Sequence, residues 1–122
     1  MIKGIGIYIL EIKRFASLYS KWGDKLINKI FNEDELLFSV SKKRVVESLS
    51  GKFAAKEAVA KAFGTGLGSD IAFKDLRILK DNHGKPIVYY KGKKSTNIHL
   101  SITHSNEYAA AFAILELSLI HI

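Results

Sequence analysis

The first residues of the chain alternate between two sets of positions. Ile5, Ile7 and Ile9 fall at every second place, with Gly6 and Tyr8 between them. An alternation of period two is typical of a half-buried β-strand, because successive side chains of a strand point to opposite faces. The pattern therefore predicts a strand over residues 2–9.

The spacing then changes to that of helices. Between Ile12 and Trp22 apolar residues recur every three or four positions, with basic and polar residues on the other side, and Gly23 follows. This pattern predicts an amphipathic helix with its apolar side buried, which Gly23 ends. A shorter amphipathic segment over residues 25–31 comes next.

Two capping residues mark the starts of further helices. Asn32, with Glu35 three residues later, has the spacing of a capping box for a short helix. Ser41 stands before a long helical pattern that reaches Phe63 and is rich in alanine from residue 53 on, which favours close packing against a neighbour. Its buried stripe is predicted at the apolar positions that repeat every seven residues, which are Val46, Phe53 and Ala60.

The second half of the chain has the patterns of strands and turns. Strands are expected over residues 73–80, 87–90, 98–103 and 108–117, with turns at 81–86 and 106–107. The alanines of the last strand suggest close packing on both of its faces. Helices followed by strands indicate an α+β fold in which helices pack on an antiparallel sheet. One domain is expected over residues 1–117, with a short apolar tail at 118–122.

Composition narrows the class of protein. Of the 122 residues 48% are hydrophobic and 25% are charged, as in an ordinary globular domain, and there is no cysteine. Disulfide scaffolds and cysteine-based metal sites are thereby excluded, which favours a reducing, cytoplasmic location. The apolar start is too short and too interrupted to span a membrane. The net charge of +7 attracts anions of several kinds, so charge alone does not select one.

Glu57 and Lys61 are the first candidates for chemistry. They stand four residues apart on the long predicted helix, where the ordinary interpretation is an exposed ion pair. However, Glu57 lies only ~40° of helical rotation from the buried stripe. A carboxylate beside a packed face needs a cation or a metal ion as its partner.

Two weaker signals come later in the chain. Gly64, Thr65 and Gly66 begin a glycine-rich loop whose backbone amides are candidates for contact with a phosphate, although a helix stop explains the loop equally well. His104 stands at the end of a predicted strand between two hydroxyl residues, where it is either a phosphate ligand or an ordinary surface side chain. No second histidine has the spacing of a zinc site.

Four segments together resemble one family. Residues 4–14 (GIGIYILEIKR), 53–66 (FAAKEAVAKAFGTG), 82–86 (NHGKP) and 99–110 follow, in order and spacing, the motifs of bacterial holo-[acyl-carrier-protein] synthases. The resemblance reaches to about residue 117. It implies a compact α+β homotrimer that transfers 4′-phosphopantetheine from coenzyme A to a serine of acyl carrier protein, in fatty-acid biosynthesis and with Mg²⁺.

The resemblance also implies roles for individual residues. Glu57 matches the magnesium-binding glutamate, and Lys61 matches a lysine near the pyrophosphate. The remaining positions that match coenzyme A contacts are Arg44 and Lys52 near its phosphates, Gly64, Thr65 and Gly66 in the ligand loop, and Lys85, Pro86 and His104 from the neighbouring subunit. The helix that bears Lys13, Arg14 and Lys21 matches the docking helix for the acidic carrier protein.

Tyr8 departs from the family pattern. The first motif has an aspartate there, the second protein ligand of the magnesium, and a phenol with a pKa near ~10 is a poor ligand for a hard cation. Three interpretations stay open. Glu57, phosphates and water hold the metal with lower affinity; or Glu11, placed one helical turn away, substitutes; or the chain is impaired.

Three function hypotheses follow. The first is the transferase, and the second is a non-catalytic homologue that binds coenzyme A or carrier protein through Lys61, His104 and Arg14. The third is a basic nucleic-acid-binding domain, which has only the charge in its favour and requires salt-dependent binding to arbitrary oligonucleotides. No nucleic-acid partner and no membrane partner is expected.

Overall fold

A computed structural model describes residues 1–36, 41–68 and 70–117 of the chain. The first half holds β1 (Ile2–Glu11), α1 (Ile12–Trp22), α2 (Asp24–Ile30), the 3₁₀ turn η1 (Glu33–Glu35) and α3 (Lys42–Phe63). The second half holds the turn η2 (Phe73–Asp75) and five strands, β2 (Leu76–Lys80), β3 (Pro86–Tyr90), β4 (Lys93–Lys94), β5 (Ile98–His104) and β6 (Tyr108–Glu116). The α+β prediction is confirmed, and the predicted tail at 118–122 lies outside the described residues.

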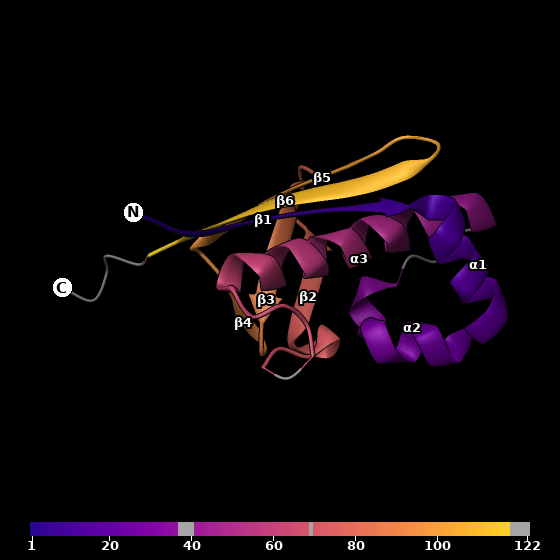
Figure 1. The fold of residues 1–122 in the computed structure, drawn as a ribbon, viewed down its shortest axis with the longest axis horizontal. Coiled ribbons are helices and arrows are strands. Elements are labelled where there is room, and N and C mark those ends of the chain that lie inside the picture. Colours follow the sequence, from indigo (N-terminus) through magenta and orange to yellow (C-terminus); the bar gives the residue numbers. More distant parts are fainter. Residues whose placement is uncertain (37–40, 69, 118–122) are drawn as a thin grey trace.

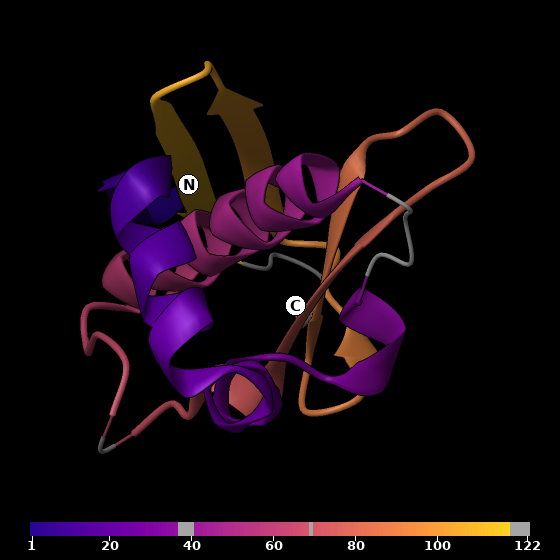
Figure 2. The ribbon, with the colours of Figure 1, turned by 90° about the vertical axis from the view of Figure 1, so that its right-hand side faces the viewer.

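The long helix α3 is the centre of the fold. It runs along one face of an antiparallel sheet with strand order β1-β6-β5, while a second sheet, β2-β3-β4, adjoins it (Figure 1). Figure 2 shows α3 in the middle of the molecule, with the long sheet behind it and the second sheet beside it. The Ser41 hydroxyl caps the helix by accepting a hydrogen bond from the Arg44 amide, and Gly64 ends it with φ of 86°. Both predicted helix boundaries are thus confirmed.

Glycines on β1 let the helix come close to the sheet. A Cβ at Gly6 would lie 1.8 Å from the carbonyl oxygen of Ala58, and one at Gly4 would lie 1.9 Å from that of Ala62. The alanines of α3 allow the same approach from the other side. The strand prediction is confirmed, but its buried face is the one that bears glycine and tyrosine, whereas Ile5, Ile7 and Ile9 point outward.

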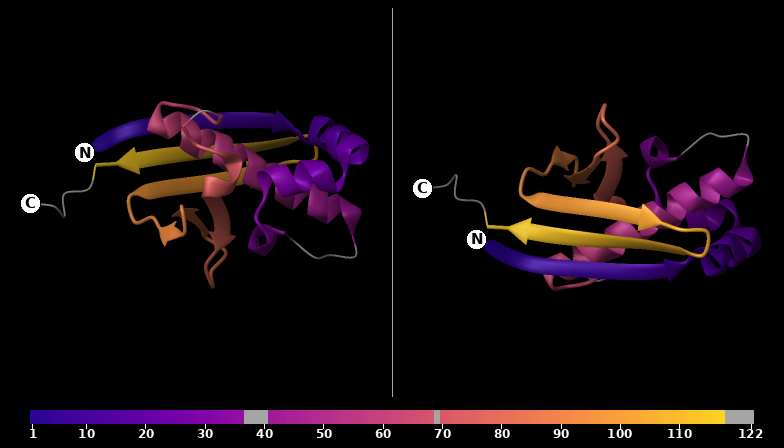
Figure 3. Two further views of the ribbon diagram at one scale, coloured as in Figure 1. Left: turned by 90° about the horizontal axis from the view of Figure 1, so that it is seen from below. Right: turned by 90° about the horizontal axis from the view of Figure 1, so that it is seen from above.

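The outer face of the long sheet is bare within one chain. Figure 3, seen from above, shows β1, β6 and β5 with no element covering them. Ile5, Ile7 and Ile9 are 57%, 60% and 65% exposed, and Phe112 on β6 is 40% exposed. Ala109, Ala111 and Ala113 of β6 are buried on the helix side, whereas Ala110 is partly buried on the outer face. In a single chain the predicted close packing is therefore found on the helix side only.

Helices α1 and α2 cover one end of α3. Their buried side chains include Ile12, Phe15, Ile27 and Ile30, and they form a small core with the first half of α3. Leu18 and Trp22, expected on the buried side of α1, are 43% and 50% exposed. No helix within the described residues has the length and hydropathy needed to cross a membrane.

The second sheet is built on tight turns. Residues 73–75, predicted as the start of a strand, form the 3₁₀ turn η2 instead, because the Asp75 carboxylate accepts a hydrogen bond from the Ala72 amide and closes the turn. The predicted turn at 81–86 is confirmed, since the Asp81 carboxylate accepts hydrogen bonds from the amides of His83 and Lys85.

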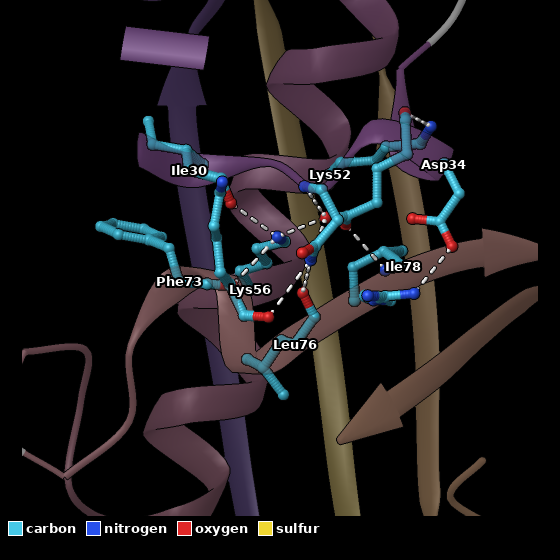
Figure 4. A network of polar contacts seen from close by, with 11 residues as sticks. Ile30, Asp34, Lys52, Lys56, Phe73, Leu76 and Ile78 are labelled. Atoms are coloured by element: carbon cyan, nitrogen blue, oxygen red, sulfur yellow. Dashed lines mark hydrogen bonds and ion pairs between the residues drawn. The ribbon is translucent and has the colours of Figure 1, made fainter. Parts of the chain in front are cut away.

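A buried ion pair holds these parts together. The Lys56 ammonium donates to Glu35 Oε1 at 2.7 Å, to the Ile30 carbonyl at 2.7 Å and to the Phe73 carbonyl at 3.0 Å (Figure 4). Glu35 in turn accepts from the amides of Asn32 and Ile78, and both charged side chains are 0% exposed. The pair therefore joins the end of α2, η1, η2 and β2 to α3. The predicted capping box of Asn32 and Glu35 is confirmed, as part of this pair.

Candidate active site

Glu57, Lys61 and Tyr8 lie together where β1 crosses α3. Lys61 Nζ donates to the carbonyl oxygen of Ile7 at 3.1 Å and lies 5.9 Å from the centre of the Tyr8 ring. That ring also meets Phe53 edge to face, with 6.0 Å between ring centres. The substitution at position 8 thus places a packed aromatic side chain beside the Glu57–Lys61 pair.

The electrostatics of this group follow from partial burial. Burial raises the pKa of Glu57, and the neighbouring Lys61 charge opposes the rise. Burial, and then the Glu57 charge, also raise the pKa of Tyr8, with Arg14 acting against them. The phenol therefore stays protonated at neutral pH, whereas Glu57 becomes a stronger proton acceptor than an exposed glutamate.

Glu11 does not reach this group. Residues 8 and 11 both belong to β1, and an odd separation along a strand puts their side chains on opposite faces. Tyr8 pairs across the sheet with the buried Ala111, whereas Glu11 pairs with the exposed Tyr108. The interpretation in which Glu11 replaces the missing aspartate is therefore wrong.

The glycine loop follows directly after Lys61. The amides of Gly64, Gly66 and Gly68 donate to the carbonyls of Lys61, Ala60 and Ile71, so these three amides do not form a phosphate cradle in this conformation. A Cβ at Gly64 or Gly66 would meet no atom within 4 Å, so the loop borders open space. Thr65 is exposed between them.

A second group of predicted residues lines a cavity of about 540 Å³. It contains Arg44 and Lys52 from α3, Pro86 from the start of β3 and His104 from the end of β5. Burial lowers the pKa of Lys52, whose ammonium donates to the Glu35 carbonyl. Lys85 is exposed in the adjoining turn and is not part of the cavity lining.

The two groups face opposite sides of α3. Lys52 and Lys61 are nine residues apart, which is about 180° around a helix of 100° per residue. Arg44 and Glu57 are 13 residues apart, or ~20 Å along the axis. One chain therefore does not bring the two groups around a common pyrophosphate.

The exposed side of α1 carries the basic residues expected to dock a carrier protein. Lys13, Arg14 and Lys21 are exposed there, beside the exposed Leu18 and Trp22. Lys21 Nζ lies 5.3 Å from the centre of the Trp22 ring. This surface therefore combines positive charge with apolar area.

The residues near Glu57 offer a magnesium ion one carboxylate ligand, that of Glu57 itself. Across the ranges 1–36, 41–68 and 70–117 no three His, Asp or Glu side chains come together as a metal site. Mg²⁺ keeps several waters and takes one or two carboxylates together with phosphate oxygens. Glu57 fits as that one carboxylate, and the neutral Tyr8 phenol does not serve as a second anionic ligand.

Sequence analysis missed the roles that three polar residues have in these surroundings. Glu47 and Lys80 line the basic cavity, and Glu35 is the buried partner of Lys56. Glu47 had a detectable signal, since it stands one helical turn after Arg44 on the same helix. Lys80 comes from a separate strand, and the partner of Lys56 is 21 residues away, so neither follows from local spacing.

Comparisons with known proteins identify the family. Residues 4–113 match the sequence model of the 4′-phosphopantetheinyl transferase superfamily. The holo-[acyl-carrier-protein] synthase of Bacillus pumilus is 48% identical over 118 residues, covering 95% of this chain and 97% of that protein. The enzyme of the same name from a Geobacillus species is 50% identical over 118 residues, covering 95% and 98%. A crystal structure of the Bacillus anthracis synthase, in complex with CoA (3′,5′-ADP), is 40% identical with a TM-score of 0.82, covering 97% and 99%.

Proposed function

The chain belongs to the 4′-phosphopantetheinyl transferase superfamily, as a holo-[acyl-carrier-protein] synthase, and on that premise we propose that it transfers 4′-phosphopantetheine from coenzyme A to a serine of apo acyl carrier protein. The observation that carries the proposal is the half-buried Glu57, with the charge of Lys61 one helical turn away on α3, within the segment that matches the family. The reaction forms a bond between the serine oxygen and the phosphorus of phosphopantetheine. It breaks the pyrophosphate linkage and releases adenosine 3′,5′-bisphosphate.

Glu57 and Lys61 act at the reacting phosphate in this proposal. Glu57, or a metal-bound water that it holds, accepts the proton of the attacking serine. Lys61, held by the Ile7 carbonyl, stabilises the negative charge that develops on the pyrophosphate oxygens. A magnesium ion held by Glu57 and phosphate oxygens would supply further neutralisation of that charge.

The second group binds the rest of coenzyme A. Arg44, Lys52 and His104 supply positive charge, and Pro86 supplies apolar contact, around one cavity. Because this group faces away from Glu57, we place the two groups of one active site on neighbouring subunits. Thr65 and its glycine neighbours then line the ligand from the side of Lys61, and Lys85 extends the second group.

A homotrimer would bring the two groups together. The bare sheet face, with exposed Ile5, Ile7, Ile9 and Phe112, supports this assembly, because a soluble monomer rarely leaves a continuous apolar face in water. Identical faces that meet around a three-fold axis form a closed assembly. Three active sites then lie at the three subunit boundaries.

Acyl carrier protein docks on α1 in the same proposal. Lys13, Arg14 and Lys21 attract the acidic partner, which raises the rate of encounter. The exposed Leu18 and Trp22 add apolar area that a purely electrostatic contact would not need. We place this reaction in fatty-acid biosynthesis, and we keep the cytoplasm as its compartment because the sequence has no cysteine.

Tyr8 favours a second candidate function. In this alternative the chain binds coenzyme A or carrier protein without turning over, because a packed phenol occupies the place of the second metal-binding carboxylate. The remaining contacts of Lys61, His104 and Arg14 would still hold the two partners. The two candidates differ only in whether the phosphoryl group is transferred.

Intact-mass spectrometry of apo acyl carrier protein separates the candidates. The carrier protein is incubated with coenzyme A, magnesium and either the original chain, the Tyr8→Asp variant or the Glu57→Gln variant. A carrier protein that gains one phosphopantetheine with the original chain, and none with Glu57→Gln, supports the transferase. Gain with Tyr8→Asp alone supports the binding homologue, and no gain with any of the three contradicts the transferase.

A further inference from the structure

A carboxylate lines the otherwise basic cavity. Arg44, Lys52 and Lys80 surround it with positive charge, and Glu47 lies among them. Glu47 is half-buried, with its side chain 18% exposed, and its Oε2 lies 3.5 Å from Nδ1 of His104. A negative charge in a cavity that binds anions weakens that binding by repulsion unless it serves another purpose.

The two partners of this contact differ in how firmly they are held. Glu47 is in the first half of α3, one turn after Arg44, within a regular helix of 22 residues. His104 is the last residue of β5, where the chain turns over through Ser105. The imidazole at the strand end is half exposed, and its Nδ1 atom lies 3.5 Å from the carboxylate on the helix.

We propose that Glu47 is a positioning residue for His104, which fixes the imidazole with Nδ1–H toward the carboxylate so that Nε2 binds a phosphate of coenzyme A. The two ring nitrogens of histidine are distinct, and the hydrogen bond of one decides the state of the other. When both ring nitrogens carry hydrogen, Nδ1–H donates to the carboxylate and Nε2–H donates to a phosphate oxygen. This inference rests on the proposed function, because it takes His104 as a coenzyme A contact.

A surface ion pair is the ordinary alternative. Exposed pairs contribute little to stability, and many have no function. Here the acid is partly buried and lies inside the ligand cavity, where its charge opposes the substrate. If Glu47 positions His104, removal of the Glu47 charge weakens binding of the anion. If Glu47 only repels the anion, removal of its charge strengthens that binding.

Binding of adenosine 3′,5′-bisphosphate, measured by titration calorimetry, tests the proposal on the full chain. We compare Glu47→Gln, His104→Gln and the double variant, with Glu33→Gln as a control that removes an exposed carboxylate outside the cavity. The proposal predicts that each single variant binds about tenfold more weakly and that the double variant is no weaker than the worse single one, because coupled residues are not additive. The control binds like the original chain.

A second measurement separates positioning from a fault in folding. In nitrogen-resolved NMR, the imidazole of His104 should show a hydrogen-bonded Nδ1 in the original chain, and Glu47→Gln should lose that signature. With coenzyme A as substrate, Glu47→Gln should raise KM and leave kcat unchanged, since only binding is lost.

The results that overturn the inference differ from those that overturn the proposed function. Unchanged or tighter binding by Glu47→Gln, or additive losses in the double variant, would show that Glu47 does not act through His104. If His104→Gln bound like the original chain, the assignment of His104 itself would fail, and the inference would fall with it. If the original chain did not bind the bisphosphate at all, the proposed function would fail.

Discussion

Replacement of Lys56 by methionine tests the role of the buried ion pair. Methionine keeps the long unbranched shape of the lysine stem but removes the ammonium, so the change is mainly electrostatic. Lys61→Met is the matched control, because it makes the same substitution on the same helix at an exposed position. Lys61 donates one hydrogen bond from its side chain to a carbonyl, that of Ile7.

The expected cost follows from the contacts of Lys56. Its ammonium donates three hydrogen bonds of 2.7–3.0 Å, two of them to carbonyls at the end of α2 and the start of η2. Burial lowers the pKa of Lys56, and the Glu35 charge and hydrogen bond oppose that shift. Without Lys56 the fully buried Glu35 carboxylate loses its ion-pair partner, and breaking such a pair costs about 3–5 kcal/mol of unfolding free energy.

Thermal and urea unfolding measure this cost. For a chain of this size, 1 kcal/mol shifts the melting temperature by roughly 3–5 °C, so Lys56→Met should lower it by roughly 10–20 °C. The Lys61→Met control should stay within about 1 kcal/mol of the original chain. If both variants lost similar amounts, or if Lys56→Met lost less than about 1 kcal/mol, the buried pair would not join α3 to the rest of the fold as inferred.

Three further predictions concern the active site and the helix–sheet contact. Tyr8→Asp should raise the transfer rate and lower the magnesium concentration for half-maximal activity, because it restores a second carboxylate ligand. Tyr8→Phe should leave that concentration unchanged. The same dependence of activity on magnesium in all three proteins would contradict this role of position 8. Glu57→Gln should abolish transfer, and it should raise the melting temperature at pH 7 but not near pH 4. Burial raises the pKa of Glu57 above 4.5, so the folded chain favours the protonated carboxyl. The stability gained from this preference is complete below the pKa of Glu57 in the unfolded chain and is lost as pH rises through its pKa in the folded chain. A melting temperature that falls at pH 7 would refute that sign. In urea unfolding, Gly6→Ala should lower the free energy of unfolding by at least about 1–3 kcal/mol, since its Cβ would meet a backbone oxygen at 1.8 Å. Gly51→Ala, whose Cβ would meet only an Ile102 methyl at 3.1 Å, should be near neutral. Equal losses in the two variants would argue against the close approach of β1 and α3.

Local patterns predicted the elements of this fold well. Ser41 and Gly64 bound α3 as their capping chemistry requires, and Asp81 closes the expected turn. The face of β1 that is buried was not predictable, because in a strand that alternates isoleucine with glycine the isoleucines are the ones expected to be buried. In one chain the glycines face α3, because a residue with a Cβ would not allow the backbones of β1 and α3 to approach so closely.

The site was predictable only as far as motifs reach. The resemblance singled out Glu57, Lys61, Arg44 and His104, but spacing along the sequence does not show that they fall on two sides of α3. The partners Glu35 of Lys56 and Glu47 of His104 join segments far apart in the sequence, 21 and 57 residues away. Such pairs are set by the tertiary fold, which a local pattern does not encode.

Mixing two inactive variants tests most directly the claim that one transferase site is made from two subunits. Glu57→Gln disables the first group, and an Arg44→Ala/His104→Ala double variant disables the second. Refolded together in equal amounts, the two should regain about a quarter of the original activity on apo acyl carrier protein, because a quarter of the subunit boundaries then carry both intact groups. Activity no greater than that of the separate variants would contradict the account.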